Sequence, residues 1–238
     1  MKQKGLLIAL EGIDGSGTTT HAKELVSFMT NRLGPTHFTF EPSQGPIGGM
    51  LRQVLQHRIE HPLSDDVIAL LFAADRIDHF TVEILPRLIR GEHVVTDRYV
   101  YSSLAYQSTT LPLEWVTTIN ERVPPPDLAI YLRVSPDVAA SRRSQRSGPE
   151  ELFDKDATQR RVTDLYDLLL GDNNSCGTCA LTKDQSSWQI NPIGTLPTPP
   201  NTFSKTHHRA IINGDLPLLE VQSQLQTLIE KFAQFIKG

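Results

Sequence analysis

Short runs of apolar residues alternate along the chain with stretches whose apolar positions recur at helical spacing. Runs that suit buried strands cover residues 5–11, 37–41, 93–96, 127–134 and 209–213. Helical patterns cover residues 18–33, 46–57, 64–89, 112–122, 135–145, 155–170 and 216–236. Because strands that alternate with helices build parallel sheets covered on both faces, this order predicts an α/β fold with a doubly wound, five-stranded parallel sheet. In such a sheet the ligand lies at the carboxyl ends of the strands.

Two polar segments interrupt this alternation. Residues 144–154 contain Gly and Pro, which is typical of a mobile loop, and with the end of the preceding helix they form a predicted lid at about 142–154. Residues 171–208 are rich in Asn, Ser, Thr and Pro and are interpreted as an insertion before the last strand. The chain, residues 1–238, is therefore expected to form a single domain with a lid and an insertion.

Composition narrows the class of protein. The 238 residues are 39% hydrophobic, and their net charge of −4 shows no general nucleic-acid-binding pattern. No run of about 18 apolar residues occurs, so we expect no membrane span. Acidic Glu11 and Asp14 follow the first apolar run where a signal peptide would have its cleavage site, so this run is interpreted as a strand. The chain has only two cysteines, so a framework of disulfide bonds is not expected. This favours a reducing compartment, and a cytoplasmic location is predicted.

A phosphate-binding loop is predicted where the first strand, LLIALE, runs into GIDGSGTTT and a helical pattern. Gly12, four residues, then Gly17, Thr18 and Thr19 have the spacing of a Walker A loop in its strand–loop–helix setting. Backbone amides at a helix N-terminus favour phosphate, and glycines permit its close approach. The candidate ATP-binding residues are Gly12, Gly15, Ser16, Gly17, Thr18, Thr19 and Thr20. The alternative is a Gly-rich turn that only joins a strand to a helix.

One residue departs from the Walker A pattern. Thr18 occupies the position of the usual lysine, whereas Thr19 stands where a hydroxyl would contact Mg²⁺. Either another cation replaces the lysine, or catalysis is weakened or lost.

Several blocks follow one another in a specific order and spacing, namely EGIDGSGTTT, EPSQGPIGGMLR, LLFAADRIDH, VVTDRYVYSSLAYQ, PDLAIYLRVSPDVAASRR and ELF followed by RVTDLYDLL. In these blocks the chain resembles the thymidylate kinase family of P-loop nucleoside monophosphate kinases, apart from the insertion. This resemblance implies the P-loop NTPase fold, ATP-dependent and Mg²⁺-requiring phosphorylation of dTMP to dTDP, and a homodimer. It implies neither a nucleic-acid partner nor a membrane partner.

The resemblance also implies an acceptor site. Phe72 would stack on thymine, and Arg76, four residues along the same helix, would hold the acceptor phosphate. Phe72 could instead be a core aromatic residue, and Arg76, flanked by Asp75 and Asp78, could be a solvated surface charge.

Further acceptor contacts come from the end of the third strand and from the loop. By resemblance, Arg98 binds the acceptor phosphate, and Asp97 acts near Mg²⁺ or its water shell. Gln107 would read the pyrimidine edge, with Tyr106 or Tyr99 near the sugar. Asp14 would approach the acceptor sugar hydroxyl and the reacting phosphate. Alternatively, Gln107 is a helix-surface amide and Asp14 only caps a turn.

Catalytic cations are expected from the lid, because Arg142, Arg143 and Arg146 end a predicted helix. Family members with Gly at the loop position of Gly15 tend to supply arginine from the lid. These arginines could instead be cations favoured by the C-terminal dipole of the helix.

Two further departures from the family affect the expected charges. Phe40 replaces an Arg of the family near the acceptor site, and Arg133 replaces an Asp at a strand end. Arg133 and the lid arginines are candidate replacements for the missing lysine, and Lys23 is a weaker candidate because it lies further along the helix.

The insertion holds both cysteines. Cys176 and Cys179 have the spacing of a zinc knuckle, and His207 and His208 could complete four ligands. Adjacent histidines are unusual as a ligand pair, so we expect no stoichiometric zinc. Two other functions stay open beside a dTMP kinase: a kinase for another pyrimidine nucleotide or a deoxynucleoside, and a catalytically weak nucleotide-binding regulatory protein, favoured by Thr18.

Overall fold

A computed structural model describes residues 4–59, 62–145, 152–153, 155–171, 183–184, 187–188 and 207–236. Its centre is a five-stranded sheet with the order β2-β3-β1-β4-β7, in which all neighbouring strands are parallel. The strands are β1 (Leu7–Glu11), β2 (Thr36–Phe40), β3 (His93–Asp97), β4 (Leu128–Arg133) and β7 (His208–Asn213). The predicted doubly wound parallel sheet is thus confirmed.

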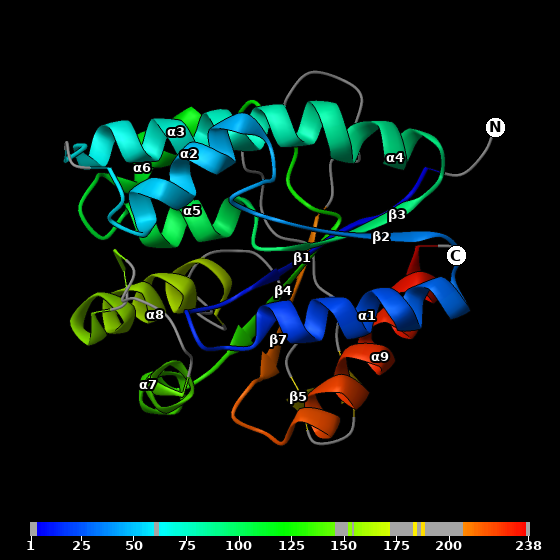
Figure 1. The fold of residues 1–238 in the computed structure, drawn as a ribbon. Helices are drawn as coiled ribbons and strands as arrows, with labels where there is room; N and C mark the ends of the chain where they lie inside the picture. The colour runs from blue at the N-terminus through cyan, green and yellow to red at the C-terminus, as the bar shows by residue number, and fades with distance from the viewer. Residues whose placement is uncertain are drawn as a thin grey trace.

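Side chains of β1 alternate between the two faces of the sheet. Ile8 and Leu10 pack with the helices α1 (Thr18–Arg32) and α9 (Leu218–Phe235), which lie together on one face (Figure 1). Leu7 and Ala9 belong to the core on the opposite face. Because β1 has apolar neighbours on both faces, its sequence is a continuous apolar run.

The opposite face carries most of the remaining helices (Figure 1). They are α2 (Pro46–Leu55), α3 (Asp65–His79), α4 (Leu85–Ile89), α5 (Val100–Gln107), α6 (Leu113–Asn120) and α8 (Asp156–Leu170). The shorter α7 (Pro136–Ser144) lies beside the loop that joins β1 to α1.

Two helical features differ from the sequence prediction. The expected helix over 64–89 contains a π-helical turn, η1 (Phe80–Ile84), directly before α4. Pro86 follows this turn and has no N–H to complete the regular helical hydrogen-bond ladder. Helix α5 was not predicted, because seven of its eight residues are buried and no polar stripe marks a helical period.

Within the predicted insertion, β5 (Lys183–Asp184) and β6 (Ser187–Trp188) pair antiparallel. None of the helices in the described ranges combines the length and the apolar character that a membrane span needs.

Candidate active site

The loop between β1 and α1 has the geometry of a phosphate cradle. Gly15 and Gly17 adopt φ angles of 93° and 86°, which side chains rarely tolerate. A Cβ on Gly15 would lie 2.5 Å from the carbonyl oxygen of Ala139, so α7 packs directly on the loop. The loop therefore places the N-terminus of α1 and the arginine-bearing α7 side by side.

The first residues of α1 carry two hydroxyl groups in different surroundings. Thr18 is only 6% exposed, whereas Thr19 donates a hydrogen bond from its hydroxyl to Asp97 Oδ2. The other carboxylate oxygen of Asp97 is buried and has no hydrogen-bond partner among the described residues. A hydroxyl beside a buried, unsatisfied carboxylate oxygen is a donor set that suits Mg²⁺. Within the described ranges, no group of three or more His, Cys, Asp or Glu could hold a metal ion.

Arg98 connects the end of β3 with the phosphate loop. Its backbone is left-handed, with φ 69°, and its Nη2 lies 2.6 Å from Asp14 Oδ1. Its Nη1 donates to the carbonyl of Gly12 at 2.8 Å, and its guanidinium lies 5.0 Å from the ring centre of Tyr106. Burial lowers the pKa of Arg98, but Tyr106 and Asp14 outweigh this and raise it well above its ordinary value. Arg98 is therefore a fixed positive charge facing the loop.

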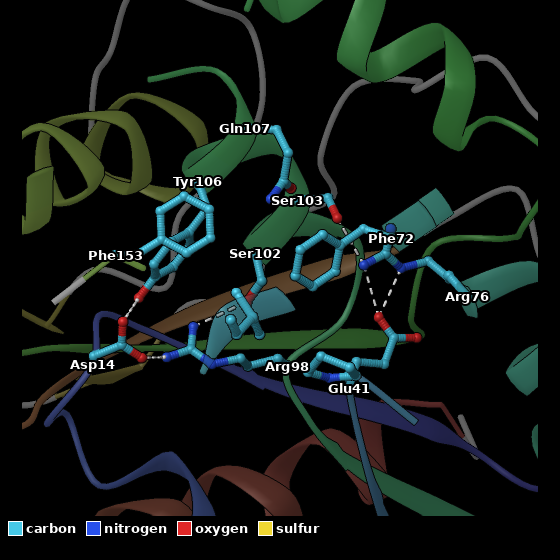
Figure 2. A pocket seen from close by; sticks show the side chains of 12 residues that line it. Asp14, Glu41, Phe72, Arg76, Arg98, Ser102, Ser103, Tyr106, Gln107 and Phe153 are labelled. Carbon is cyan, nitrogen blue, oxygen red and sulfur yellow. Dashed lines mark hydrogen bonds and ion pairs between the residues drawn. The ribbon is translucent and has the colours of Figure 1, made fainter. Parts of the chain in front are cut away.

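Asp14 is held by neighbours other than the turn that follows it. Its Oδ2 accepts a hydrogen bond from the Tyr106 hydroxyl at 2.9 Å, in addition to the ion pair with Arg98. Burial raises the pKa of Tyr106 well above its usual range, so the phenol stays protonated and donates. None of these hydrogen bonds caps the turn, and the Asp14 carboxylate faces the interior of the site (Figure 2).

Arg76 is buried, with only 1% of its side chain exposed, so the surface-charge interpretation is wrong. Its Nη2 lies 2.7 Å from Glu41 Oε2 and donates to Ser103 Oγ at 2.9 Å, and its Nη1 donates to Asn120. The adjacent Asp75 instead accepts hydrogen bonds from Ser43. A buried guanidinium with this many partners is held in one orientation.

A pocket lies between the loop, β3, α3 and α5 (Figure 2). It is lined by Asp14, Glu41, Pro42, Leu55, Phe72, Arg76, Arg98, Ser102, Ser103, Tyr106, Gln107 and Phe153. Phe72 is partly exposed at this pocket, which excludes the core interpretation. Gln107 is 5% exposed, and its Oε1 has no partner among the described residues. In Figure 2 the charged side chains of Asp14, Arg98 and Glu41 lie along one side of the pocket, and the Gln107 amide lies on the opposite side.

Tyr99 does not line the pocket. It is fully buried, and its hydroxyl donates to the carbonyl of Pro124 at 3.1 Å. Of the two tyrosines considered for the sugar, only Tyr106 reaches the site.

Several lining residues were not singled out from the sequence. Glu41 directly follows β2 and opens the block EPSQGPIGGMLR, and its position at a strand end is a signal that could have identified it. Ser102 and Ser103 lie on the unpredicted α5. Phe153 lies far away in the sequence, and its ring packs edge-on against Tyr106 at 5.4 Å.

The cations near the loop differ in their surroundings. Arg143 donates to the carbonyl of Asp14 at 2.8 Å and to Asp156 at 2.8 Å. Arg142 donates to the carbonyl of Gly214 at 3.0 Å. Burial, followed by the positive charge of Arg142, lowers the pKa of His21, which lies in the first turn of α1. Arg146 lies outside the described residues, and only parts of the predicted lid are described.

Two other candidate cations point elsewhere. Arg133 forms an exposed ion pair with Asp167 at 2.7 Å. Lys23 lies 5.6 Å from the ring centre of Phe38, whose ring also neighbours that of Phe40.

Of the candidate zinc ligands, Cys176 and Cys179 lie outside the described residues. His207 and His208 are both buried, and burial together with His208 lowers the pKa of His207 to about 4. The absence of stoichiometric zinc stays a prediction.

Comparison with known proteins assigns the chain to a family. The thymidylate kinase family model matches residues 10–185. A probable thymidylate kinase of Pyrobaculum aerophilum is 42% identical over 161 residues, which cover 67% of this chain and 80% of the relative. One of Pyrococcus abyssi is 44% identical over 156 residues, covering 64% of this chain and 76% of the relative.

The fold agrees with this assignment. The structure of thymidylate kinase from Candida albicans superposes with a TM-score of 0.70 at 23% identity, covering 97% of this chain and 93% of that one. The family model spans the phosphate loop, Arg76, Arg98 and the predicted lid. The chain therefore belongs to the thymidylate kinase family and is a nucleoside monophosphate kinase.

Proposed function

We propose that this protein transfers the γ-phosphoryl group of ATP to dTMP, with Mg²⁺, through the site that joins the phosphate loop to the pocket. The observation that carries the proposal is the placement of Arg76 and Arg98 on one pocket that opens toward Asp14 of the loop. Two guanidinium groups suit an acceptor that already carries a phosphate, because their planar donors match phosphate oxygens.

The pocket suits a pyrimidine monophosphate. The Phe72 ring would stack on the base, and the unsatisfied Gln107 Oε1 would accept a hydrogen bond from the thymine N3–H. Tyr106 would pack near the sugar, and Asp14 would approach its hydroxyl. A pocket sized for one ring disfavours purines.

The donor side is assigned to the loop residues from Gly12 to Thr20, whose amides would cradle the ATP phosphates. Thr19 and Asp97 would hold Mg²⁺, which would supply charge neutralisation on the phosphates. The protein's own part is to fix the two nucleotides in line and to exclude water.

The charge of the missing lysine is assigned to the lid. Arg142 is the favoured replacement, because its helix α7 packs on the phosphate loop at Gly15 and it has no carboxylate partner among the described residues. Arg143 would stabilise the loop through the carbonyl of Asp14. Arg133 and Lys23 are not favoured, since each is engaged away from the loop.

A homodimer is also proposed. Exposed apolar side chains lie along α3, η1 and α4, namely Val67, Leu70, Ile77, Val82 and Ile89. Burying such a row against a second copy is favourable. The cytoplasmic location and the lack of nucleic-acid and membrane partners stay predictions from the sequence.

A coupled assay with ATP tests the proposal against its rivals. We expect dTMP to be phosphorylated and thymidine not, because thymidine lacks the phosphate that Arg76 and Arg98 would bind. Faster turnover of thymidine would favour a deoxynucleoside kinase, and faster turnover of another pyrimidine monophosphate would reassign the acceptor.

A further inference from the structure

A single buried glutamine links the phosphate loop to the acceptor pocket. Gln159 lies in the first turn of α8 and is 0% exposed. Its Oε1 accepts the backbone N–H of Asp14 at 3.1 Å. Its Nε2 donates to Asp14 Oδ2 at 2.7 Å and to the carbonyl of Phe153 at 2.8 Å.

The chemistry of the partners fixes how this amide is oriented. A backbone N–H can only donate, so the atom that faces it must be the amide oxygen. The carboxylate of Asp14 and the carbonyl of Phe153 can only accept, so both must face the NH₂ group. A flipped amide would lose all three hydrogen bonds, and no other neutral side chain of this size offers one acceptor and two donors.

Asp14 has every polar group engaged. Its carbonyl accepts from Arg143, and its carboxylate accepts from Arg98, Tyr106 and Gln159. Among these neighbours only Gln159 contacts both the main chain and the side chain of Asp14. Gln159 therefore ties the carboxylate to the backbone of the loop, while Arg98 and Tyr106 hold the same carboxylate from the pocket side.

The third hydrogen bond of Gln159 reaches the pocket wall. Phe153 lines the acceptor pocket, and its ring packs against Tyr106, which is itself bonded to Asp14. Gln159 thus bonds to both Phe153 and Asp14, and Tyr106 contacts the same two residues from the pocket (Figure 2 shows Asp14, Tyr106 and Phe153). A nucleotide that displaces Phe153 would therefore disturb its hydrogen bond to Gln159, whose side-chain amide also bonds to the phosphate loop at Asp14.

We propose that Gln159 is a positioning residue for phosphoryl transfer, which ties the geometry of the phosphate loop at Asp14 to occupancy of the acceptor pocket at Phe153. The inference rests on the proposed function, in which Asp14 approaches the acceptor. Small misplacements of reacting groups cost large factors in rate, whereas ground-state binding is less sensitive. Loss of Gln159 should therefore affect kcat more than KM.

Gln159→Glu is the sharpest test, because it keeps the shape and the acceptor but replaces the donor by a charge. At alkaline pH two carboxylates would face each other, and we expect kcat to fall at least about thirtyfold while KM for dTMP changes less than about threefold. A shared proton should bind this pair as the pH falls, so the deficit should shrink toward acid. Arg98, Tyr106 and Arg143 face the pair, and they are the same in both proteins.

Gln159→Met removes the hydrogen bonds without adding a charge, and it gives a readout independent of turnover. With wild-type protein, saturating dTMP alone should slow hydrogen exchange of amides in the loop over 12–18; in the Met variant dTMP should bind without this protection. Gln226→Glu, an exposed change on α9, is the control for added charge and should behave as wild type. Melting temperatures identify any variant that has simply lost its fold.

The outcomes are distinguishable. If wild-type protein phosphorylates dTMP and both Gln159 variants keep normal kcat and normal loop protection, the inference is wrong and the proposed function stands. If kcat of Gln159→Glu falls equally at every pH, Gln159 is structural only. If wild-type protein does not bind dTMP, the proposed function fails and the inference fails with it.

Discussion

Arg98 reaches from the end of β3 to the phosphate loop, where its Nη2 lies 2.6 Å from Asp14 Oδ1. Its left-handed backbone, at φ 69°, is a conformation that a bulky residue adopts only when its surroundings compensate the strain. The hydrogen bonds to Gly12 and Asp14 supply that compensation. One residue thus joins the third strand, the loop and the acceptor pocket.

Removal of this guanidinium should abolish most acceptor recognition. We expect Arg98→Ala to lower kcat/KM for dTMP at least about a hundredfold, because a buried charge-assisted contact is worth roughly 3 kcal/mol. Arg90→Ala, which changes an exposed arginine of an exposed ion pair, is the matched control. Steady-state kinetics decide the matter, and near-normal values for Arg98→Ala would place the acceptor elsewhere.

Arg76 should serve both stability and acceptor binding, and the two roles can be separated. Arg76→Met removes the guanidinium partner of the buried Glu41 and leaves only His79, whose Nδ1 lies 3.3 Å from Glu41 Oε1. We therefore expect the free energy of unfolding to fall by about 3 to 5 kcal/mol. Adding Glu41→Gln removes the orphaned charge and should restore part of that stability without restoring activity. Urea unfolding and dTMP kinetics on the single and double variants measure the two effects. Recovery of activity in the double variant would show that Arg76 does not contact the acceptor.

Glu11 should make stability depend on pH. Burial raises its pKa to about 7 from 4.5, although hydrogen bonding to Ser102 and the charge of Arg98 oppose the shift. The folded protein then holds a proton that the unfolded chain has released, so stability falls as the pH rises through this interval. Glu11→Gln should remove this dependence and be more stable above neutral pH, by up to about 3 kcal/mol. Parallel unfolding curves for the two proteins at every pH would contradict the assignment.

If Arg142 replaces the missing lysine of the phosphate loop, a lysine introduced at position 18 should restore activity that is lost with Arg142. Arg142→Ala should lower kcat far more than it weakens ATP binding, since one lost cation costs about 3 to 4 kcal/mol of transition-state stabilisation. Thr18→Lys in that background should restore part of the rate. Arg133→Ala is the control, because its ion pair with Asp167 is exposed. If Arg142→Ala turns over normally, the cation comes from another residue.

The sheet could be predicted from the sequence because its central strands have apolar neighbours on both faces and read as unbroken apolar runs. Helix α5 could not, since burial on nearly all sides removes the period that identifies a helix. The phosphate loop could be predicted because its characteristic residues lie within one short stretch of the sequence. The burial of Arg76 was not, because Glu41, Ser103 and Asn120 come from three separate segments of the chain. Gln159 was missed for the same reason, as it lies 145 residues from Asp14.

The most direct test of the account is single-turnover transfer by the wild-type Thr18 protein. Enzyme is mixed with Mg²⁺, γ-labelled ATP and either dTMP or a purine monophosphate, and the labelled products are separated. We expect label to appear in dTDP, and to appear there faster than in ADP or GDP formed from AMP or GMP. Tight binding of ATP and dTMP without any transfer of label would contradict this expectation and would identify a nucleotide-binding regulatory protein instead.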